Sequence, residues 1–413
     1  MQALHSHPEG TRTLSITCLV CGAKSVDEKL DVGRHPVASF YLTQKDEPET
    51  DVRLALGQCE NCGTIQSTDL VPHTALVPPY DWIVAMEPEE HLDTVADQVE
   101  ALLGNPDGKV VGALTYKDDT MVDRLVRKGF ENTWRIKLDE DLGISDPSAS
   151  NETVQKLVTR ERMAGLGAKL GQVDFLIVRH ILEHVEDVPE FVMGLSELVK
   201  PGGILMLEVP DCTSNLKLAD YCMIWEEHSL YLTPETFAPL SSIGGFESIR
   251  QDVYERPFEN SLVQLSRKTG EPGPVKISAE AKKQLGALTS YADRFEPACK
   301  ELRAKLEKIR AEQGPIALFG AGHLACAFVN YMGVADLIDF VADDTPQKQY
   351  KFLPGARLPI LPSSELVDKN IALSLLCLSI SNEEKVIARN QEFEKQGGVF
   401  RSIFRESSRS IFD

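Results

Sequence analysis

Two cysteine pairs with the same spacing constrain the fold of this 413-residue chain more than any other feature. They read C-L-V-C-G (Cys18, Cys21) and C-E-N-C-G (Cys59, Cys62), each followed by a glycine where a tight turn needs backbone freedom. Two such knuckles can place four thiolates tetrahedrally around one ion, which leaves no open coordination position. We therefore predict a structural zinc ion held by these four cysteines in a small N-terminal lobe.

The charge and composition narrow the classes of partner. A formal net charge of -20 argues against binding to nucleic acid or to an anionic membrane surface, because both need clustered Lys and Arg. The sequence has no apolar run of about 18 residues and no charged-then-apolar leader, so neither a membrane span nor a secretory signal is expected. A cytoplasmic location is the resulting expectation.

The middle of the chain alternates helix and strand patterns. Apolar residues at helical spacing predict a helix over 92–103, and strand patterns follow at 109–114, 174–181 and 203–209. The last two strands are separated by a helical stretch that ends in Pro-Gly-Gly, which indicates a crossover helix. This pattern predicts a doubly wound α/β sheet whose ligand lies beyond the carboxyl ends of the strands, where His184 falls.

The stretch FLIVRHILEHVEDVPEFVMGLSELVKPGGILMLEVPD resembles the later half of a class I S-adenosylmethionine-dependent methyltransferase domain. With the cysteine pairs and the C-terminal segment, the order of parts is similar to the sugar-nucleotide C-methyltransferases, which alkylate a carbon beside the ketone of a nucleotide-linked deoxysugar. The resemblance covers nearly the whole chain. It implies a zinc-binding lobe (1–80), a class I methyltransferase-like α/β domain (81–270), and a helical linker with a C-terminal Rossmann-like domain that binds the nucleotide sugar (271–413).

The stretch W-E-E-H stands where that family has Tyr-His-Glu-His, which supplies the base that removes the proton next to the ketone. The resemblance implies that His228 is this base and that Glu227 orients it, because a neutral imidazole accepts a proton near neutral pH. Taken alone, this charge run would indicate a solvated face. His184 and Tyr80 are implied to stabilise or reprotonate the enolate, and Trp225 and Tyr231 to contact the substrate.

The methyl-donor site departs from the family pattern. In place of a glycine-rich turn after the first strand the chain has residues 115–119, Gly112 lies within the strand, and Lys137 stands where a ribose-binding acid is expected. The donor-binding candidates that remain are Gly112, Asp118 and His180. Either S-adenosylmethionine binds through an altered loop and the carbon is methylated, or the chain is a non-methylating epimerase or isomerase of a keto-sugar nucleotide. A non-catalytic binding protein is the third alternative.

The C-terminal part begins after TGEPGPVK (269–276) with a predicted helix over 278–313 that is interrupted at Pro297. Its apolar residues form a heptad-like seam, which we expect to pack either on the rest of this chain or on a second subunit. A monomer or a homodimer is therefore expected. A strand then leads into a Gly320-Ala321-Gly322 turn of the kind that cradles phosphate. We expect this turn, with His323 and Lys348, to hold the diphosphate, and the absence of Gly-x-Gly-x-x-Gly argues against a nicotinamide cofactor.

Overall fold

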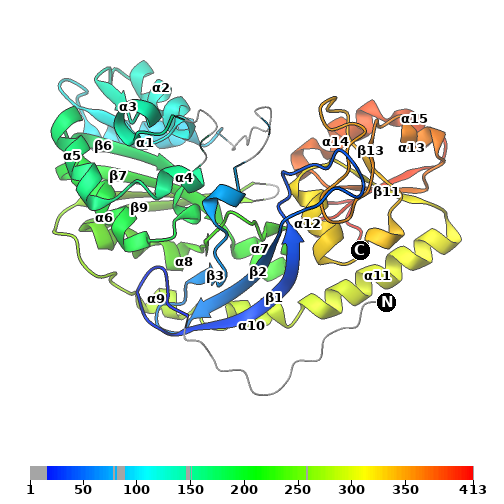
Figure 1. The fold of residues 1–413 in the computed structure, drawn as a ribbon. Helices are drawn as coiled ribbons and strands as arrows, with labels where there is room; N and C mark the ends of the chain where they lie inside the picture. The colour runs from blue at the N-terminus through cyan, green and yellow to red at the C-terminus, as the bar shows by residue number, and fades with distance from the viewer. Residues whose placement is uncertain are drawn as a thin grey trace.

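The computed structural model describes residues 16–77, 80, 89–145, 149, 151–256 and 259–412. They form three sheets, with the strands of the N-terminal lobe lying between the central and the C-terminal domain (Figure 1). Among the described residues, no helix combines the length and apolar character needed to cross a membrane.

The N-terminal lobe is an antiparallel sheet in the order β1-β2-β3-β8. Its own strands are β1 (Val26–Pro36), β2 (Asp51–Cys59) and β3 (Ile65–Ser67), and η1 (His73–Ala75) follows them. The fourth strand, β8 (Leu230–Tyr231), belongs to the later part of the chain and pairs with β3, with Ile65 opposite Tyr231. The lobe therefore fixes the position of the stretch that carries His228.

The central domain is built on a six-stranded sheet in the order β5-β4-β6-β7-β10-β9. The first four strands in that order run parallel to one another. β10 runs antiparallel to β7, and β9 runs antiparallel to β10. Their bounds are β4 (Val111–Ala113), β5 (Thr133–Arg135), β6 (Val173–Arg179), β7 (Val199–Asp211), β9 (Phe246–Tyr254) and β10 (Asn260–Lys268).

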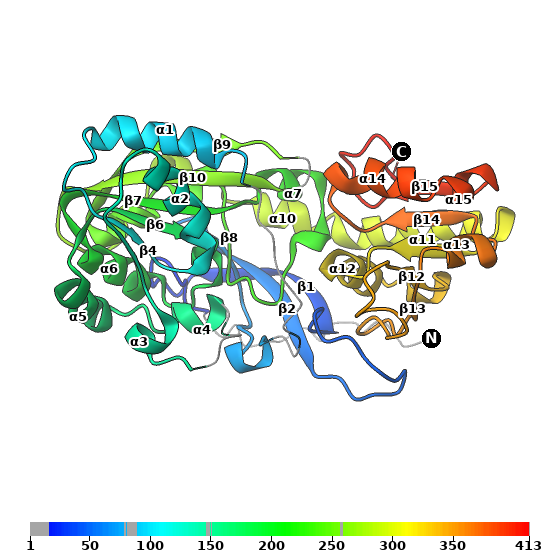
Figure 2. The same ribbon diagram turned by 90° about the horizontal axis from the view of Figure 1, so that it is seen from above.

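Helices cover both faces of this sheet (Figure 2). α1 (Leu92–Leu103) and α2 (Asp119–Arg127) lie on one face, and α5 (Arg160–Leu170) and α6 (Val188–Leu198) on the other. Side chains of β6 alternate between the two cores, as the pleat requires: Phe175 faces the first pair of helices and Leu176 the second. The predicted doubly wound α/β fold is confirmed.

Short elements complete the central domain. They are η2 (Tyr116–Asp118), α3 (Leu138–Leu142), α4 (Asn151–Gln155), η3 (Leu182–His184), α7 (Thr213–Leu218), η4 (Tyr221–Met223), α8 (Pro234–Phe237) and η5 (Leu240–Gly244). Two of them, η2 and η3, follow β4 and β6 directly and lie at the carboxyl ends of these strands.

Three helices form the linker: α9 (Ala279–Lys282), α10 (Ala287–Ala292) and α11 (Phe295–Glu312). The predicted interruption at Pro297 is wrong, because Pro297 lies in the first turn of α11, where its missing N–H has no helical partner to lose. A break instead falls at Gly286, whose φ of 88° is left-handed. Leu302 and Leu306 of the seam are buried against this chain's own core.

The C-terminal domain has a parallel sheet in the order β13-β12-β11-β14-β15. Its elements are β11 (Ile316–Phe319), α12 (His323–Tyr331), η6 (Ala335–Leu337), β12 (Val341–Ala342), β13 (Ile360–Leu361), α13 (Glu365–Asp368), β14 (Leu373–Leu376), α14 (Ile380–Arg389), α15 (Gln391–Lys395) and β15 (Val399–Ser402). One apolar core joins this domain to the N-terminal lobe, and the Tyr41 hydroxyl donates to the Ala321 carbonyl across the contact at 2.6 Å.

Candidate functional site

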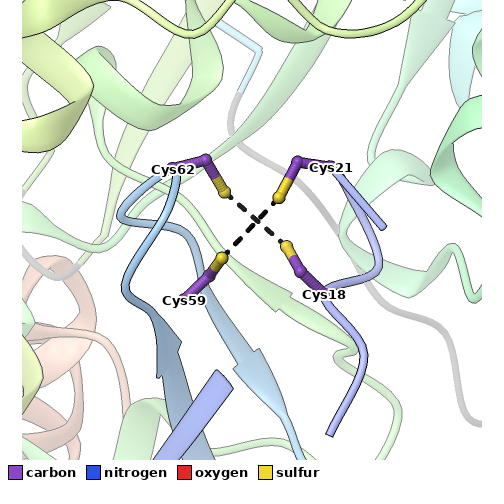
Figure 3. Close-up of side chains that lie close together, drawn as sticks. All are labelled: Cys18, Cys21, Cys59 and Cys62. Carbon is purple, nitrogen blue, oxygen red and sulfur yellow. Dashed lines mark hydrogen bonds between the residues drawn. The ribbon is translucent and has the colours of Figure 1, made fainter. Parts of the chain in front are cut away.

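The four predicted zinc ligands lie together at one end of the N-terminal lobe and point at a common centre (Figure 3). The Sγ atoms of Cys18 and Cys62 are 3.6 Å apart and those of Cys21 and Cys59 3.7 Å apart. A tetrahedral ion with Zn–S bonds of about 2.3 Å would have sulfur–sulfur edges of about 3.8 Å, so these residues fit zinc. The predicted four-cysteine zinc site is confirmed.

A small cleft lies between the N-terminal lobe and the central domain. It is lined by Ser67, Leu70, Val71, Leu76, His184, Glu186, Glu226, Glu227, His228 and Ser229. The lobe supplies the first four of these, and the segments around η3 and before β8 supply the rest. Ser229 fastens the two segments together, because its N–H donates to the Glu183 carbonyl at 2.8 Å and its hydroxyl to the Val185 carbonyl at 2.6 Å.

Two imidazoles meet in this cleft. The rings of His184 and His228 are perpendicular, with centroids 4.9 Å apart. Nδ1 of His184 lies 3.2 Å from the carbonyl oxygen of Glu227. In the neutral ring this contact places the proton on Nδ1 and the lone pair on Nε2. The cleft thus holds one imidazole in a defined tautomer beside a second, partly exposed one.

Glu183 is a site residue that our sequence reasoning missed. It is 3% exposed, and its Oε1 lies 3.9 Å from Nε2 of His184 and 3.6 Å from Nδ1 of His180. Its Oε2 has no hydrogen-bond partner among the described residues. An acidic side chain inside the apolar stretch HILEHV was the available signal, because a carboxylate is rarely buried unless it is paired.

The two neighbouring glutamates of W-E-E-H have different surroundings. Glu226 is buried and ties three parts of the molecule together: Oε1 accepts from the Ala38 N–H at 2.9 Å, and Oε2 lies 3.4 Å from Nδ1 of His323. Glu227 lines the cleft and contacts His184 through its carbonyl oxygen. The orienting role of the Glu227 carboxylate toward His228 stays a prediction.

His323 is not placed to bind phosphate, which corrects our expectation. Nε2 lies 3.1 Å from the Cys222 carbonyl, and the ring stacks on Trp225 with centroids 3.5 Å apart. Burial alone would lower the pKa of His323, but the contact with the Glu226 carboxylate raises it above its usual value. The His323 ring therefore joins the C-terminal domain to the segment that carries Trp225 and Glu226.

Tyr231 and Tyr80 also have structural contacts in place of the predicted ones. The Tyr231 side chain is 1% exposed, and its hydroxyl lies 3.2 Å from both the N and the O of Trp225. Tyr80 donates its hydroxyl to the Tyr41 carbonyl at 2.9 Å and is not among the cleft residues. The indole N–H of Trp225 is buried without a hydrogen-bond partner among the described residues, and Trp225 is not among the cleft residues either, so its contact with substrate stays a prediction.

The Gly320-Ala321-Gly322 turn has its backbone N–H groups occupied. The Gly320 N–H donates to the Ala342 carbonyl at 2.8 Å, and the Gly322 N–H donates back to Gly320 at 3.1 Å. The Ala321 N–H donates to Oδ2 of Asp343 at 2.8 Å. Lys348 pairs with the same oxygen at 3.3 Å. A side-chain carboxylate therefore stands where we expected the diphosphate.

The donor-binding candidates do not fit S-adenosylmethionine. A Cβ on Gly112 would lie 3.0 Å from the Trp134 ring, so this glycine makes room for a side chain of the protein. Asp118 is fully buried and accepts hydrogen bonds from the turn that should face the donor. His180 is buried against Glu208, with Nε2 3.3 Å from Oε1. All three expectations are corrected: among the described residues, none of them faces open space for a ligand.

Three family models match the chain in the order of its parts. A zinc binding domain matches residues 18–76, a methyltransferase domain residues 140–250, and a C-methyltransferase C-terminal domain residues 276–404. The first match lies in the lobe, the second covers the later part of the central domain and begins after β4 and β5, and the third covers the linker and the C-terminal sheet.

Two curated methyltransferases are similar to this chain, one over nearly its whole length and the other over about a third of it. C-methyltransferase NovU of Streptomyces niveus is 23% identical over 398 residues, which cover 93% of this chain and 94% of the relative. Ubiquinone biosynthesis O-methyltransferase of Sinorhizobium fredii is 26% identical over 135 residues, 32% of this chain and 50% of the relative.

Solved structures match less than half of the chain. The 1,6-didemethyltoxoflavin-N1-methyltransferase of Burkholderia thailandensis has a TM-score of 0.31 at 15% identity, covering 44% of this chain and 79% of its own. The N-methyltransferase NodS of Bradyrhizobium japonicum has a TM-score of 0.30 at 12% identity, covering 46% and 93%. With three family models in order and a C-methyltransferase matched over nearly its whole length, the chain is similar to C-methyltransferases.

Proposed function

We propose that this chain binds a nucleotide-linked keto-deoxysugar in the cleft between the lobe and the central domain and removes the proton on the carbon beside the ketone. The observation that carries the proposal is the perpendicular pair of imidazoles, His184 and His228, 4.9 Å apart in that cleft. The likeness to a C-methyltransferase over 93% of the chain supports a carbon next to a carbonyl as the reacting centre.

The pair suits proton removal from carbon. The C–H electrons move onto the carbonyl oxygen as the proton passes to an imidazole, and a base with a pKa near 7 is best matched to this step. His228 is the more exposed ring and is assigned as the base, and His184 as the acid that hydrogen-bonds the developing oxyanion. Glu183, 3.9 Å from Nε2 of His184, stabilises the protonated form of that ring.

In the proposed reaction the zinc ion has a structural role, which is to hold the part of the lobe that positions His228. Zinc holds the knuckles from which β2 and β3 extend, and β3 pairs with β8 immediately after His228. Loss of the ion would release the strand that positions the base. With four sulfur ligands, the ion has no coordination position left for substrate.

The test is exchange of the substrate C–H with solvent. A thymidine-diphosphate 4-keto-6-deoxysugar in D₂O should lose the proton signal next to the ketone when the protein is added, as followed by NMR. His228→Ala should slow this exchange by about 10²- to 10⁴-fold, the usual contribution of a positioned acid or base. His73→Gln, on η1 and outside the cleft lining, is the matched histidine control. Unchanged exchange in His228→Ala would refute the assignment.

A further inference from the structure

The carboxyl ends of β4, β6 and β7 meet at the edge of the central sheet where a donor would lie in this fold. In this chain they converge on a buried cluster of charged and titratable side chains, here called the closing network. Its members are His91, Asp118, Arg179, His180 and Glu208, each between 0% and 5% exposed. The network comes from four different segments, since Arg179 and His180 are neighbours in the chain.

Asp118 closes the turn after β4. Its Oδ2 accepts hydrogen bonds from the N–H groups of Leu114 and Thr115, both at 2.8 Å, and its Oδ1 accepts from the N–H of Arg179 at 2.9 Å. These are backbone groups of the kind that a glycine-rich turn offers to a ligand. Here the side chain four residues farther along the same turn takes them.

Arg179 and Glu208 fill the space next to that turn. Nε of Arg179 donates to Oε2 of Glu208 at 2.6 Å, and Nη1 donates to the Lys117 carbonyl at 2.5 Å. The other carboxylate oxygen of Glu208 lies 2.8 Å from Nε2 of His91 and 3.3 Å from Nε2 of His180. Both oxygens of Glu208 are therefore engaged, which leaves neither for the hydroxyls of a ribose.

The closing network continues to the proposed catalytic pair. His180 contacts Glu208 through one ring nitrogen, and its other nitrogen lies 3.6 Å from Oε1 of Glu183. The same Glu183 oxygen is the one 3.9 Å from His184. Residues at the donor end thus support the carboxylate that faces His184, so opening this end would also disturb the proposed acid.

We propose that the closing network replaces the methyl donor, and that the enolate formed at His228 is reprotonated instead of methylated. This inference rests on the proposed function. The proton that leaves the carbon returns to the opposite face of that carbon, which gives an epimer, or to a neighbouring carbon after enolisation along the ring, which gives an isomeric ketone. The step is balanced without a co-reactant. The substrate class is a nucleotide-linked ketose with an acidic C–H beside the carbonyl.

The closing network also sets the expected affinity for a donor. Admitting a donor here means separating the buried Arg179–Glu208 pair, and breaking a buried pair is strongly unfavourable. The cost of breaking the pair reduces the affinity tenfold for each 1.4 kcal/mol. The donor should therefore bind about 10²- to 10⁴-fold more weakly than it would bind to an open site.

The experiment has two independent readouts on the zinc-loaded full chain. Calorimetric titration with S-adenosylmethionine, and separately with S-adenosylhomocysteine, should give no saturable heat up to about 1 mM ligand. Deuterium exchange into the thymidine-diphosphate 4-keto-6-deoxysugar should proceed at the same rate with and without S-adenosylmethionine, and mass spectrometry should find no methylated sugar.

The outcomes separate the two proposals. Saturable donor binding, a methylated product, or exchange that needs the donor would overturn the closed donor end. Absence of exchange under every condition would overturn the proposed base and the donor-free reaction with it. In that case, the calorimetry still decides on its own whether the closing network excludes the donor. Exchange without donor binding supports both.

Discussion

Replacing Arg179 by Met should cost the central domain far more stability than the loss of one exposed ion pair. Arg179 and Glu208 are each 1% exposed, and Arg179→Met leaves the Glu208 carboxylate buried without its cation. Burial alone would raise the pKa of Glu208, but His180, His91 and Arg179 hold it well below its usual value, so the carboxylate is charged in the fold. Breaking such a pair costs about 3–5 kcal/mol.

A matched control sits in the same domain. Arg135 pairs with Asp119 at 2.8 Å, but the two side chains are 42% and 50% exposed. Solvent screens that pair, so Arg135→Met should cost about 0–1 kcal/mol. The double variant Arg179→Met/Glu208→Gln should recover part of the loss, because it removes the unpaired charge while keeping an oxygen that faces His91 and His180.

Amide hydrogen exchange of peptides from β6 and β7 is the suitable assay, because it reports the opening free energy of one region in a multidomain chain. We expect the exchange of these strands to accelerate by about 10²- to 10³-fold in Arg179→Met and by less than tenfold in Arg135→Met. Equal effects of the two substitutions would refute the claim that Arg179 and Glu208 form a buried ion pair.

Three further predictions follow from the contacts. Elemental analysis should find one zinc per chain, lost in Cys59→Ser together with C–H exchange activity, while Cys299→Ser on α11 keeps both. The pKa of His323 is raised in the folded protein, so its ion pair with Glu226 stabilises the fold fully at pH values below the ordinary histidine pKa of about 6.5. This stabilisation is lost as the pH rises through the higher folded-state pKa. The difference in melting temperature between wild type and His323→Gln, measured over about pH 6–9, should therefore shrink toward high pH. Glu183→Gln should move the pH–rate profile of C–H exchange to lower pH, because it destabilises the imidazolium form of His184. The control is Glu186→Gln, since the Glu186 carboxylate pairs with Lys156, and it should leave the profile in place. Identical profiles for the two variants would contradict the role of Glu183.

The sequence predicted those parts of the molecule that depend on local pattern. The helix over 92–103 has the bounds of α1, and the cysteine spacing located the zinc site, because periodicity and knuckle spacing are local properties. The strands over 174–181 and 203–209 correspond to β6 and β7 for the same reason.

The predictions that were wrong concern residues whose partners lie in distant segments of the chain. The Gly320-Ala321-Gly322 turn looks open in the sequence, but Asp343, 22 residues later, takes the N–H of Ala321. His323 likewise looks available until Glu226, nearly a hundred residues earlier, is found beside it. Such partners come together only through the packing of three sheets, which no local pattern reports.

The same arrangement occurs at two strand-to-helix turns of this protein, those after β4 and β11, and that repetition limits how a ligand can be recognised. Asp118 takes the backbone N–H groups after β4, and Asp343 takes one after β11, so each turn accepts a carboxylate of the chain itself where related folds bind an anion. Recognition must then fall to side chains of the cleft, among them the imidazoles of His184 and His228. A site built this way keeps what proton transfer from carbon requires, a base and an acid, and gives up what a second, charged cofactor would require.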